Sequence, residues 1–158
     1  MENLKLSNVL ELVKQPTLTK EEQQKITSLS IRHLDSGSCN GCELELNALS
    51  NLIYDIGGHG IRFEASPRHA DILILTGCYT RNLEYAVLKT IEAMPIPRIL
   101  AVGDCAITGG CFRSSYAVLS PEKRATAVLA AIDAVRIRVE GCPPKPERIL
   151  KALLHIDI

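Results

Sequence analysis

The chain has 158 residues and balanced charges, with 18 Lys and Arg against 18 Asp and Glu. This length suits a domain with a sizeable buried core, so folding does not depend on disulfide bonds. A formal net charge of zero gives no field that would favour nucleic acid or an anionic membrane surface. The longest apolar runs, at residues 72–75 and 127–132, fall far short of the roughly 18 residues of a membrane span, so no direct span is expected.

Residues 1–29 are predicted to form an N-terminal helical arm. Leu6, Val9, Leu10 and Val13 recur at three- and four-residue steps, and Pro16 breaks the pattern. Charged residues are spread through this region, and no apolar signal sequence is recognisable in it. We therefore expect a reduced, cytosolic chain in which cysteines bind metal or react instead of forming disulfides.

Residues 30–158 alternate between strand and helix patterns. Short apolar runs predict five strands, at 31–34, 61–63, 72–75, 99–102 and 135–139. Apolar stripes and capping residues predict helices at 42–56, 83–94, 120–132 and 146–154. This alternation is typical of a parallel α/β sheet, and we expect a flavodoxin-like sheet in the order 2-1-3-4-5 with helices on both faces.

Cysteines follow four of the five predicted strands. Cys39 and Cys42 follow the first strand, Cys78 the third, Cys105 the fourth and Cys142 the fifth. The carboxyl ends of parallel strands meet at one edge of the sheet, where ligands bind in such folds. A C-x-x-C pair with single cysteines much later suits ligands gathered by folding, which makes an iron–sulfur cluster the leading hypothesis. The residues alone leave open whether Cys78 or Cys142 completes a set of four.

The cysteines also allow a zinc site, a redox-active C-x-x-C pair or a purely structural role. Four thiolates also suit a structural zinc ion in a binding module without redox function, although such sites usually join two close C-x-x-C knuckles. A redox-active C-x-x-C would leave Cys105 and Cys142 without a role. Cys78 and Cys111 are interpreted as small, buried apolar residues.

Small residues and prolines flank the cysteines. Asn40-Gly41 and Gly103 would let the backbone approach a cluster and turn N–H groups toward its sulfurs, which tunes the reduction potential. Pro143-Pro144 is predicted to fix a rigid corner after Cys142.

Four motifs carry a resemblance to a known family: SCNGCELE at 38–45, TRN at 80–82, GDCA at 103–106 and GCPPKPE at 141–147. At these residues the chain resembles the small subunit of nickel–iron hydrogenases. It is most similar to the short version in energy-converting, membrane-bound (group 4) enzymes of the formate hydrogenlyase or Ech type. The complex I B subunit shares the superfamily. The resemblance implies that Cys39, Cys42, Cys105 and Cys142 bind one proximal [4Fe-4S] cluster.

The resemblance implies a non-catalytic subunit of an oxidoreductase complex, with no catalytic residue of its own. It would pass electrons between a ferredoxin-like subunit and a nickel–iron centre in a separate large subunit. Membrane subunits would hold the complex at the inner face of the cell membrane, so the chain is expected to be cytoplasmic and peripheral. The alternative is a complex-I-like subunit that passes electrons to a quinone.

Several details refine this prediction. Complex I relatives have adjacent cysteines in the first motif, whereas Asn40-Gly41 separates them here, which favours the hydrogenase branch. The family usually has other residues at positions 78 and 111, so these cysteines inherit no role.

Glu43 and Glu45 open a predicted helix, where the helix dipole favours negative charge. Arg81 is expected to pair with a carboxylate of the partner.

Overall fold

The computed structural model describes residues 18–24, 28–124, 128–130 and 137–156. Most of the predicted N-terminal arm therefore lies outside the described residues. Parts of the predicted helix at 120–132 and the start of the predicted strand at 135–139 also lie outside them. The division into an arm and a domain stays a prediction.

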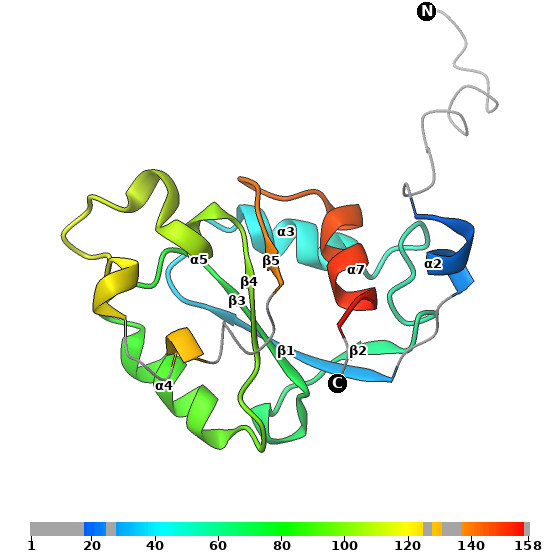
Figure 1. The fold of residues 1–158 in the computed structure, drawn as a ribbon, viewed down its shortest axis with the longest axis horizontal. Helices are drawn as coiled ribbons and strands as arrows, with labels where there is room; N and C mark the ends of the chain where they lie inside the picture. The colour runs from blue at the N-terminus through cyan, green and yellow to red at the C-terminus, as the bar shows by residue number, and fades with distance from the viewer. Residues whose placement is uncertain (1–17, 25–27, 125–127, 131–136, 157–158) are drawn as a thin grey trace, which may run out of the picture.

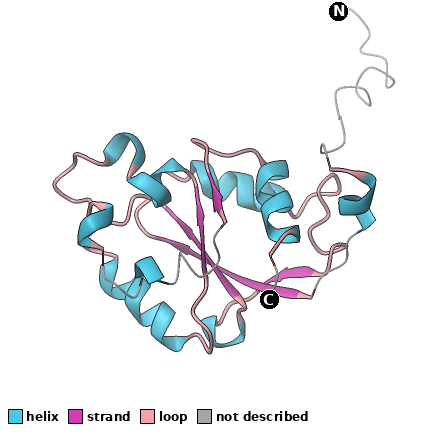
Figure 2. Cartoon of the chain, viewed as in Figure 1, coloured by secondary structure: helices cyan, strands magenta, loops and turns pink. Residues whose placement is uncertain are grey.

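A parallel sheet in the order β2-β1-β3-β4-β5 forms the centre of the fold (Figures 1 and 2). Its strands are β1 Leu29–Asp35, β2 Ile61–Phe63, β3 Ile72–Thr76, β4 Ile99–Val102 and β5 Arg138–Val139. Every residue of β3 and β4 is buried, as expected for central strands covered on both faces. The predicted topology is confirmed.

Helices cover both faces of this sheet (Figure 1). Helices α3 (Gly41–Ala48) and α7 (Pro146–Leu154) contribute to one core, and α4 (Glu84–Ala93) contributes to the other. Strand residues alternate between the two cores: Ile72 and Ile74 belong to the first, whereas Leu73 and Leu75 belong to the second. The predicted helix at 146–154 is confirmed residue for residue.

Shorter elements accompany these strands and helices, and residues 128–130 are also helical. The shorter elements are the helices α2 (Lys20–Gln24) and α5 (Asp104–Thr108), and the 3-10 helices η1 (Pro67–His69), η2 (Gly110–Phe112) and η3 (Pro121–Lys123). Across the described ranges, no helix is both long enough and apolar enough to span a membrane.

Helix α2 is tied to the C-terminal helix through Glu22. Thr19 and Glu22 form a capping box, in which each backbone N–H donates to the other side chain, at 2.8 and 3.2 Å. The Glu22 carboxylate also lies 3.0 Å from Lys151 Nζ and 2.8 Å from His155 Nε2. These bonds lower the pKa of Glu22 to about 2, the Thr19 backbone N–H having the largest effect.

The helix predicted at 42–56 is shorter than expected. It ends at Ala48, because the Asn51 side chain accepts hydrogen bonds from the backbone N–H groups of Ile53 at 2.8 Å and Tyr54 at 3.1 Å. Such a turn competes with helical hydrogen bonding. Leu52, which belongs to the apolar stripe that predicted the longer helix, is fully exposed as a result.

Candidate metal centre

The cysteines predicted as ligands line one pocket at the carboxyl ends of the strands. Cys39, Cys42, Cys105 and Cys142 share it with Ser38, Gly41, Gly77, Asp104, Gly141 and Pro143. Cys105 is buried, Cys42 is half-buried, and Cys39 and Cys142 are exposed. The fold therefore gathers thiols from three strand ends that are far apart in sequence.

Backbone hydrogen bonds hold the loops of Cys105 and Cys142 together. Gly103 N donates to Val139 O at 2.8 Å, and Asp104 N donates to Gly141 O at 3.0 Å. The Asp104 carboxylate accepts a bond of 2.8 Å from Gly141 N in return. These contacts continue the pairing of β4 with β5 beyond the sheet, so the two loops leave it as one unit.

The loop before Cys39 is fixed by its own side chains and by the loop after β3. Asp35 Oδ1 accepts bonds of 2.7 Å from the backbone N–H groups of Gly37 and Ser38. Ser36 is fully buried, and its hydroxyl donates to Thr76 O at 2.6 Å. The chain therefore reaches Cys39 with a defined direction.

Two glycines allow these loops to approach each other. Gly103 has a φ of +90°, and a Cβ there would lie only 2.5 Å from Cys42 Sγ. Gly77 has a φ of +85°, and a Cβ there would lie 2.8 Å from backbone atoms of Gly37 and Ser38. Any larger residue would be strained by its φ and would push into the pocket or its wall.

The thiols in the pocket influence each other electrostatically. The pKa of Cys42 is raised to about 12, mainly by burial and also by the neighbouring Glu43, Cys105, Cys39 and Cys142. Burial also raises the pKa of Cys105 to about 11, with Cys142 the next largest contribution. The surroundings of Cys42 and Cys105 thus disfavour their free thiolates, which a positively charged metal group would stabilise.

Cys78 and Cys111 lie beside the pocket without lining it. Cys78 is buried, its thiol donates to Gly37 O at 3.0 Å, and it packs with Cys105 and Val118. Its interpretation as a small buried residue agrees with this position. Cys111 is exposed, so its interpretation as a buried residue was wrong. The turn at Gly109-Gly110, with φ of +90° and +52°, directs η2 toward solvent.

A family comparison adds independent information to this geometry. The model of the family described as NADH ubiquinone oxidoreductase, 20 Kd subunit, matches residues 39–156, a range that includes all four pocket cysteines. The chain belongs to this family.

Relatives within the family come from hydrogenase complexes and complex I-like complexes. The probable membrane-bound hydrogenase subunit mbhJ of Pyrococcus furiosus is 39% identical over 123 residues, which cover 77% of this chain and 70% of that protein. Formate hydrogenlyase subunit 7 of Escherichia coli is 36% identical over 124 residues, covering 78% of this chain and 46% of that protein.

The fold of this chain also resembles that of a subunit in a solved membrane complex. A chain of the membrane-bound sulfane sulfur reductase, an archaeal respiratory membrane complex, superimposes with a TM-score of 0.62 at 28% identity. The match covers 85% of this chain and 72% of that chain. The predicted resemblance is confirmed, and the chain is related to subunits of oxidoreductase complexes.

The donor set of the pocket fits an iron–sulfur cluster. Four cysteines are the usual ligands of a [4Fe-4S] cluster, and each thiolate binds a different iron atom. Space for such a group is kept open where Gly103 has no Cβ beside Cys42 Sγ. In the described part of the chain, no group of three or more His, Cys, Asp or Glu side chains is arranged around the position of a single metal ion.

One polar cluster beside the pocket was missed in the sequence. Glu43 was interpreted as a helix-dipole residue, but its carboxylate accepts a hydrogen bond from the Thr76 hydroxyl and lies 3.6 Å from His33 Nε2. Burial raises the pKa of Glu43, yet bonds from the Thr76 and Ser38 hydroxyls outweigh it and lower the pKa overall. Only the position of Glu43 directly after Cys42 hinted at this contact.

Proposed function

We propose that this protein is the electron-transfer subunit of a nickel–iron hydrogenase complex and carries one [4Fe-4S] cluster. Cys39, Cys42, Cys105 and Cys142 would be its ligands. The single observation that carries the proposal is the pocket in which these four thiols meet at the carboxyl edge of the sheet. Membership of the family and similarity to the hydrogenase relatives support the same assignment.

When bound, the cluster supplies a carrier that accepts and releases one electron at a time. The chain positions the ligands, because the bonded loops of Gly103 and Gly141 hold Cys105 and Cys142 at a fixed separation. It also restricts water on the inner side of the site, where Cys105 and Cys78 are buried. Thiolate ligation, backbone hydrogen bonds and burial would then set the reduction potential.

A large subunit with a nickel–iron centre is the proposed partner at the cysteine edge. Cys39 and Cys142 are exposed in the isolated chain, whereas an electron carrier beside a catalytic centre works when shielded from water. We expect a permanent interface of more than ~2,000 Å² that covers this edge. Arg81, which is exposed at the same edge, would pair there with a carboxylate of the large subunit.

A ferredoxin-like subunit is proposed as the second partner, since the cluster needs an electron donor or acceptor on its other side. Membrane subunits of the complex would place the chain at the inner face of the membrane as a peripheral subunit. These assignments draw support from relatives described as membrane-bound hydrogenase and formate hydrogenlyase subunits.

A complex-I-like subunit that reduces a quinone is the second candidate. The family description favours it, because it refers to a ubiquinone oxidoreductase. Separation of Cys39 and Cys42 by two residues favours the hydrogenase branch instead. The two candidates differ in their large subunit, since only that of a hydrogenase carries two C-x-x-C pairs for nickel and iron.

Anaerobic purification of the tagged chain from its natural host tests the proposal. We expect a large subunit with two C-x-x-C pairs to co-purify, and the complex to reduce a dye with hydrogen. A large subunit without these pairs, together with quinone reduction, would support the complex-I-like alternative. A chain that purifies alone with bound zinc would contradict both.

A further inference from the structure

Arg124 is a buried cation close to the cysteine pocket. Its side chain is only 5% exposed. Its Nη1 donates to the backbone oxygen of Ala106 at 2.6 Å, and the guanidinium lies 5.3 Å from the centre of the Tyr79 ring. Among the described residues, Nε and Nη2 have no hydrogen-bond partner, and no carboxylate lies within 4.0 Å of the guanidinium.

The contacts of Arg124 reach two loops around the pocket. Ala106 follows Cys105 in α5, so the guanidinium binds a carbonyl of the helix that carries this cysteine. Tyr79 follows Cys78, whose side chain packs directly against Cys105. Arg124 is thus a buried residue that contacts α5 next to Cys105 and the loop after β3 next to Cys78.

A buried charge without a counter-ion is costly, and natural proteins rarely keep one without a compensating anion. Burial lowers the pKa of Arg124, and the largest opposing electrostatic effects come from Tyr79 and Cys78; the carboxylate of Glu122, which is exposed to water, has a smaller one. A thiolate-bound [4Fe-4S] cluster carries net negative charge and gains another negative charge on reduction. Such a group in the pocket would be the missing counter-charge.

We propose that Arg124 is a positioning residue whose buried positive charge raises the reduction potential of the cluster. This inference rests on the proposed function. The cation would stabilise the reduced cluster more than the oxidised one, because its attraction grows with the added electron. Removing this charge is expected to shift the ratio of reduced to oxidised cluster about tenfold, which is the effect of a unit charge at a separation of about 12 Å with an effective dielectric constant of about 20.

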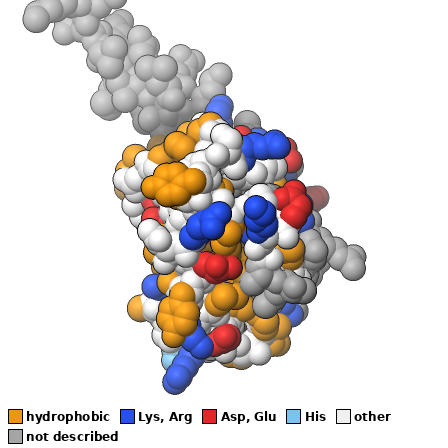
Figure 3. Space-filling model, turned by 90° about the vertical axis from the view of Figure 1, so that its left-hand side faces the viewer, with side chains coloured by type: hydrophobic (Ala, Val, Ile, Leu, Met, Phe, Trp, Pro, Cys, Tyr) orange, Lys and Arg blue, Asp and Glu red, His pale blue; other side chains and the backbone are white. Residues whose placement is uncertain are grey.

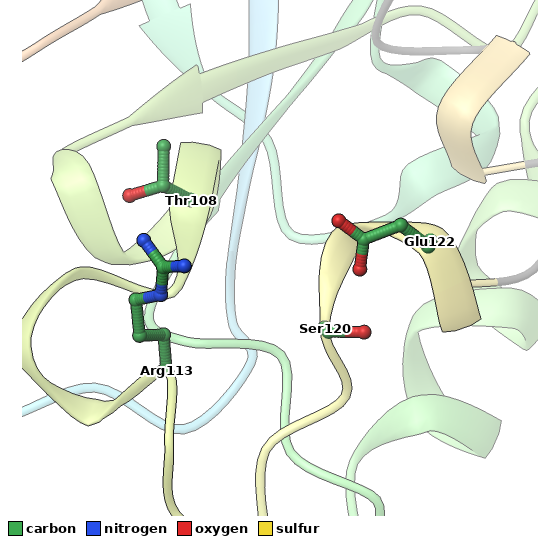
Figure 4. Close-up of a pocket in the computed structure, with 4 residues that line it drawn as sticks. All are labelled: Thr108, Arg113, Ser120 and Glu122. Carbon is green, nitrogen blue, oxygen red and sulfur yellow. The ribbon is translucent and has the colours of Figure 1, made fainter.

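Arg113 offers a matched control on the same side of the molecule. It is exposed beside a surface pocket, where Thr108 and Arg113 lie on one side and Ser120 and Glu122 on the other (Figure 4). On this face basic, acidic and hydrophobic side chains are interspersed (Figure 3). Water and salt screen a charge at such a position, so its removal is expected to shift the ratio less than twofold.

The experiment compares R124Q, R124K and R113Q in the anaerobically purified complex, by iron content and by a redox titration followed with electron paramagnetic resonance. Gln keeps an N–H donor but carries no charge, whereas Lys keeps the charge. We expect R124Q to retain its iron and to have a potential lower by about 59 mV, the one-electron equivalent of a tenfold shift. R124K and R113Q should stay close to the wild type.

Each other outcome is decisive. A wild-type potential in R124Q would overturn the role of the charge. R124Q could also lose its iron while remaining folded by circular dichroism, and R124K then decides between two roles. If R124K retains iron at the wild-type potential, the positive charge of Arg124 is what the cluster needs. If R124K loses iron as well, Arg124 only holds the loops in place and the proposal is overturned. A wild-type complex without an iron–sulfur signal would instead overturn the proposed function itself.

Discussion

The cysteine edge and the core beneath α7 differ in the residues and contacts that form them. Helix α7 places Ile149, Leu150, Leu153 and Leu154 against the sheet, each with 0% exposure. The cysteine edge consists of loops with glycines at positive φ, exposed thiols and hydrogen bonds between backbone segments. The α7 core excludes water through apolar packing, whereas the cysteine edge holds polar groups in fixed positions around a pocket.

Because of this difference, we expect the stability of the fold and the binding of metal to depend on different regions. Changes in the α7 core should alter the free energy of unfolding without changing what a folded molecule binds. Changes at the cysteine edge should alter metal content while the sheet remains intact.

Cys105→Ser should abolish or convert the cluster, because Cys105 is the buried member of the proposed ligand set and a hydroxyl is a poor substitute for thiolate at iron. The fold should remain, as judged by far-ultraviolet circular dichroism. Iron and sulfide analysis of the purified complex is the measurement. Cys111→Ser is the control and should keep its iron; a full iron content in the Cys105 variant would remove Cys105 from the ligand set.

Leu150→Ala should destabilise the fold by about 2–5 kcal/mol, because it leaves a cavity in a fully buried position. Urea unfolding of the purified chain measures this loss. The molecules that remain folded should bind as much iron as the wild type. Leu52→Ala, at a fully exposed position, should leave stability unchanged; equal effects of the two changes would contradict the assignment of the core.

Gly103→Ala should reduce cluster loading more than it reduces stability. A φ of +90° costs a residue with a Cβ about 1–2 kcal/mol, and the added carbon would lie 2.5 Å from Cys42 Sγ. Iron per folded chain is the quantity to measure. Gly57→Ala is the control, since its nearest neighbouring atom would be 4.0 Å away; identical iron contents would show that the pocket tolerates a methyl group.

Glu22→Gln should lower stability through the contact between α2 and α7, with a smaller effect than the core change. The pKa of Glu22 is depressed to about 2 from 4.5 in the folded chain, so its contribution is present above pH 4.5 and is lost as the pH falls toward 2. Urea midpoints of wild type and variant should therefore converge below pH 4.5. Glu21→Gln, at an exposed position, should show no such convergence.

Strand order could be predicted from the sequence because strand and helix patterns alternate along it, and the central strands β3 and β4 are continuous apolar runs. Residues 72–75 and 99–102 differ little from β3 and β4 as the structure has them. The grouping of cysteines at one edge follows from that order, since parallel strands place their carboxyl ends together. These features could be predicted because they depend only on local composition and on general rules of sheet topology.

Contacts that depend on individual side chains could not be predicted. The end of α3 at Ala48 depends on Asn51 competing for backbone N–H groups, which an apolar stripe does not reveal. Burial of Arg124 against Tyr79 joins segments from different loops, and nothing in either segment indicates it. Such details require the packed structure, because they arise from tertiary neighbours.

Metal analysis of the anaerobically purified complex tests the central claim most directly. Iron, acid-labile sulfide and zinc should be measured per chain of this subunit, in a preparation from which the partner subunits have been dissociated. The account predicts about four irons and about four sulfides with negligible zinc, as a [4Fe-4S] cluster on four cysteines requires. One zinc ion per chain without sulfide would contradict it.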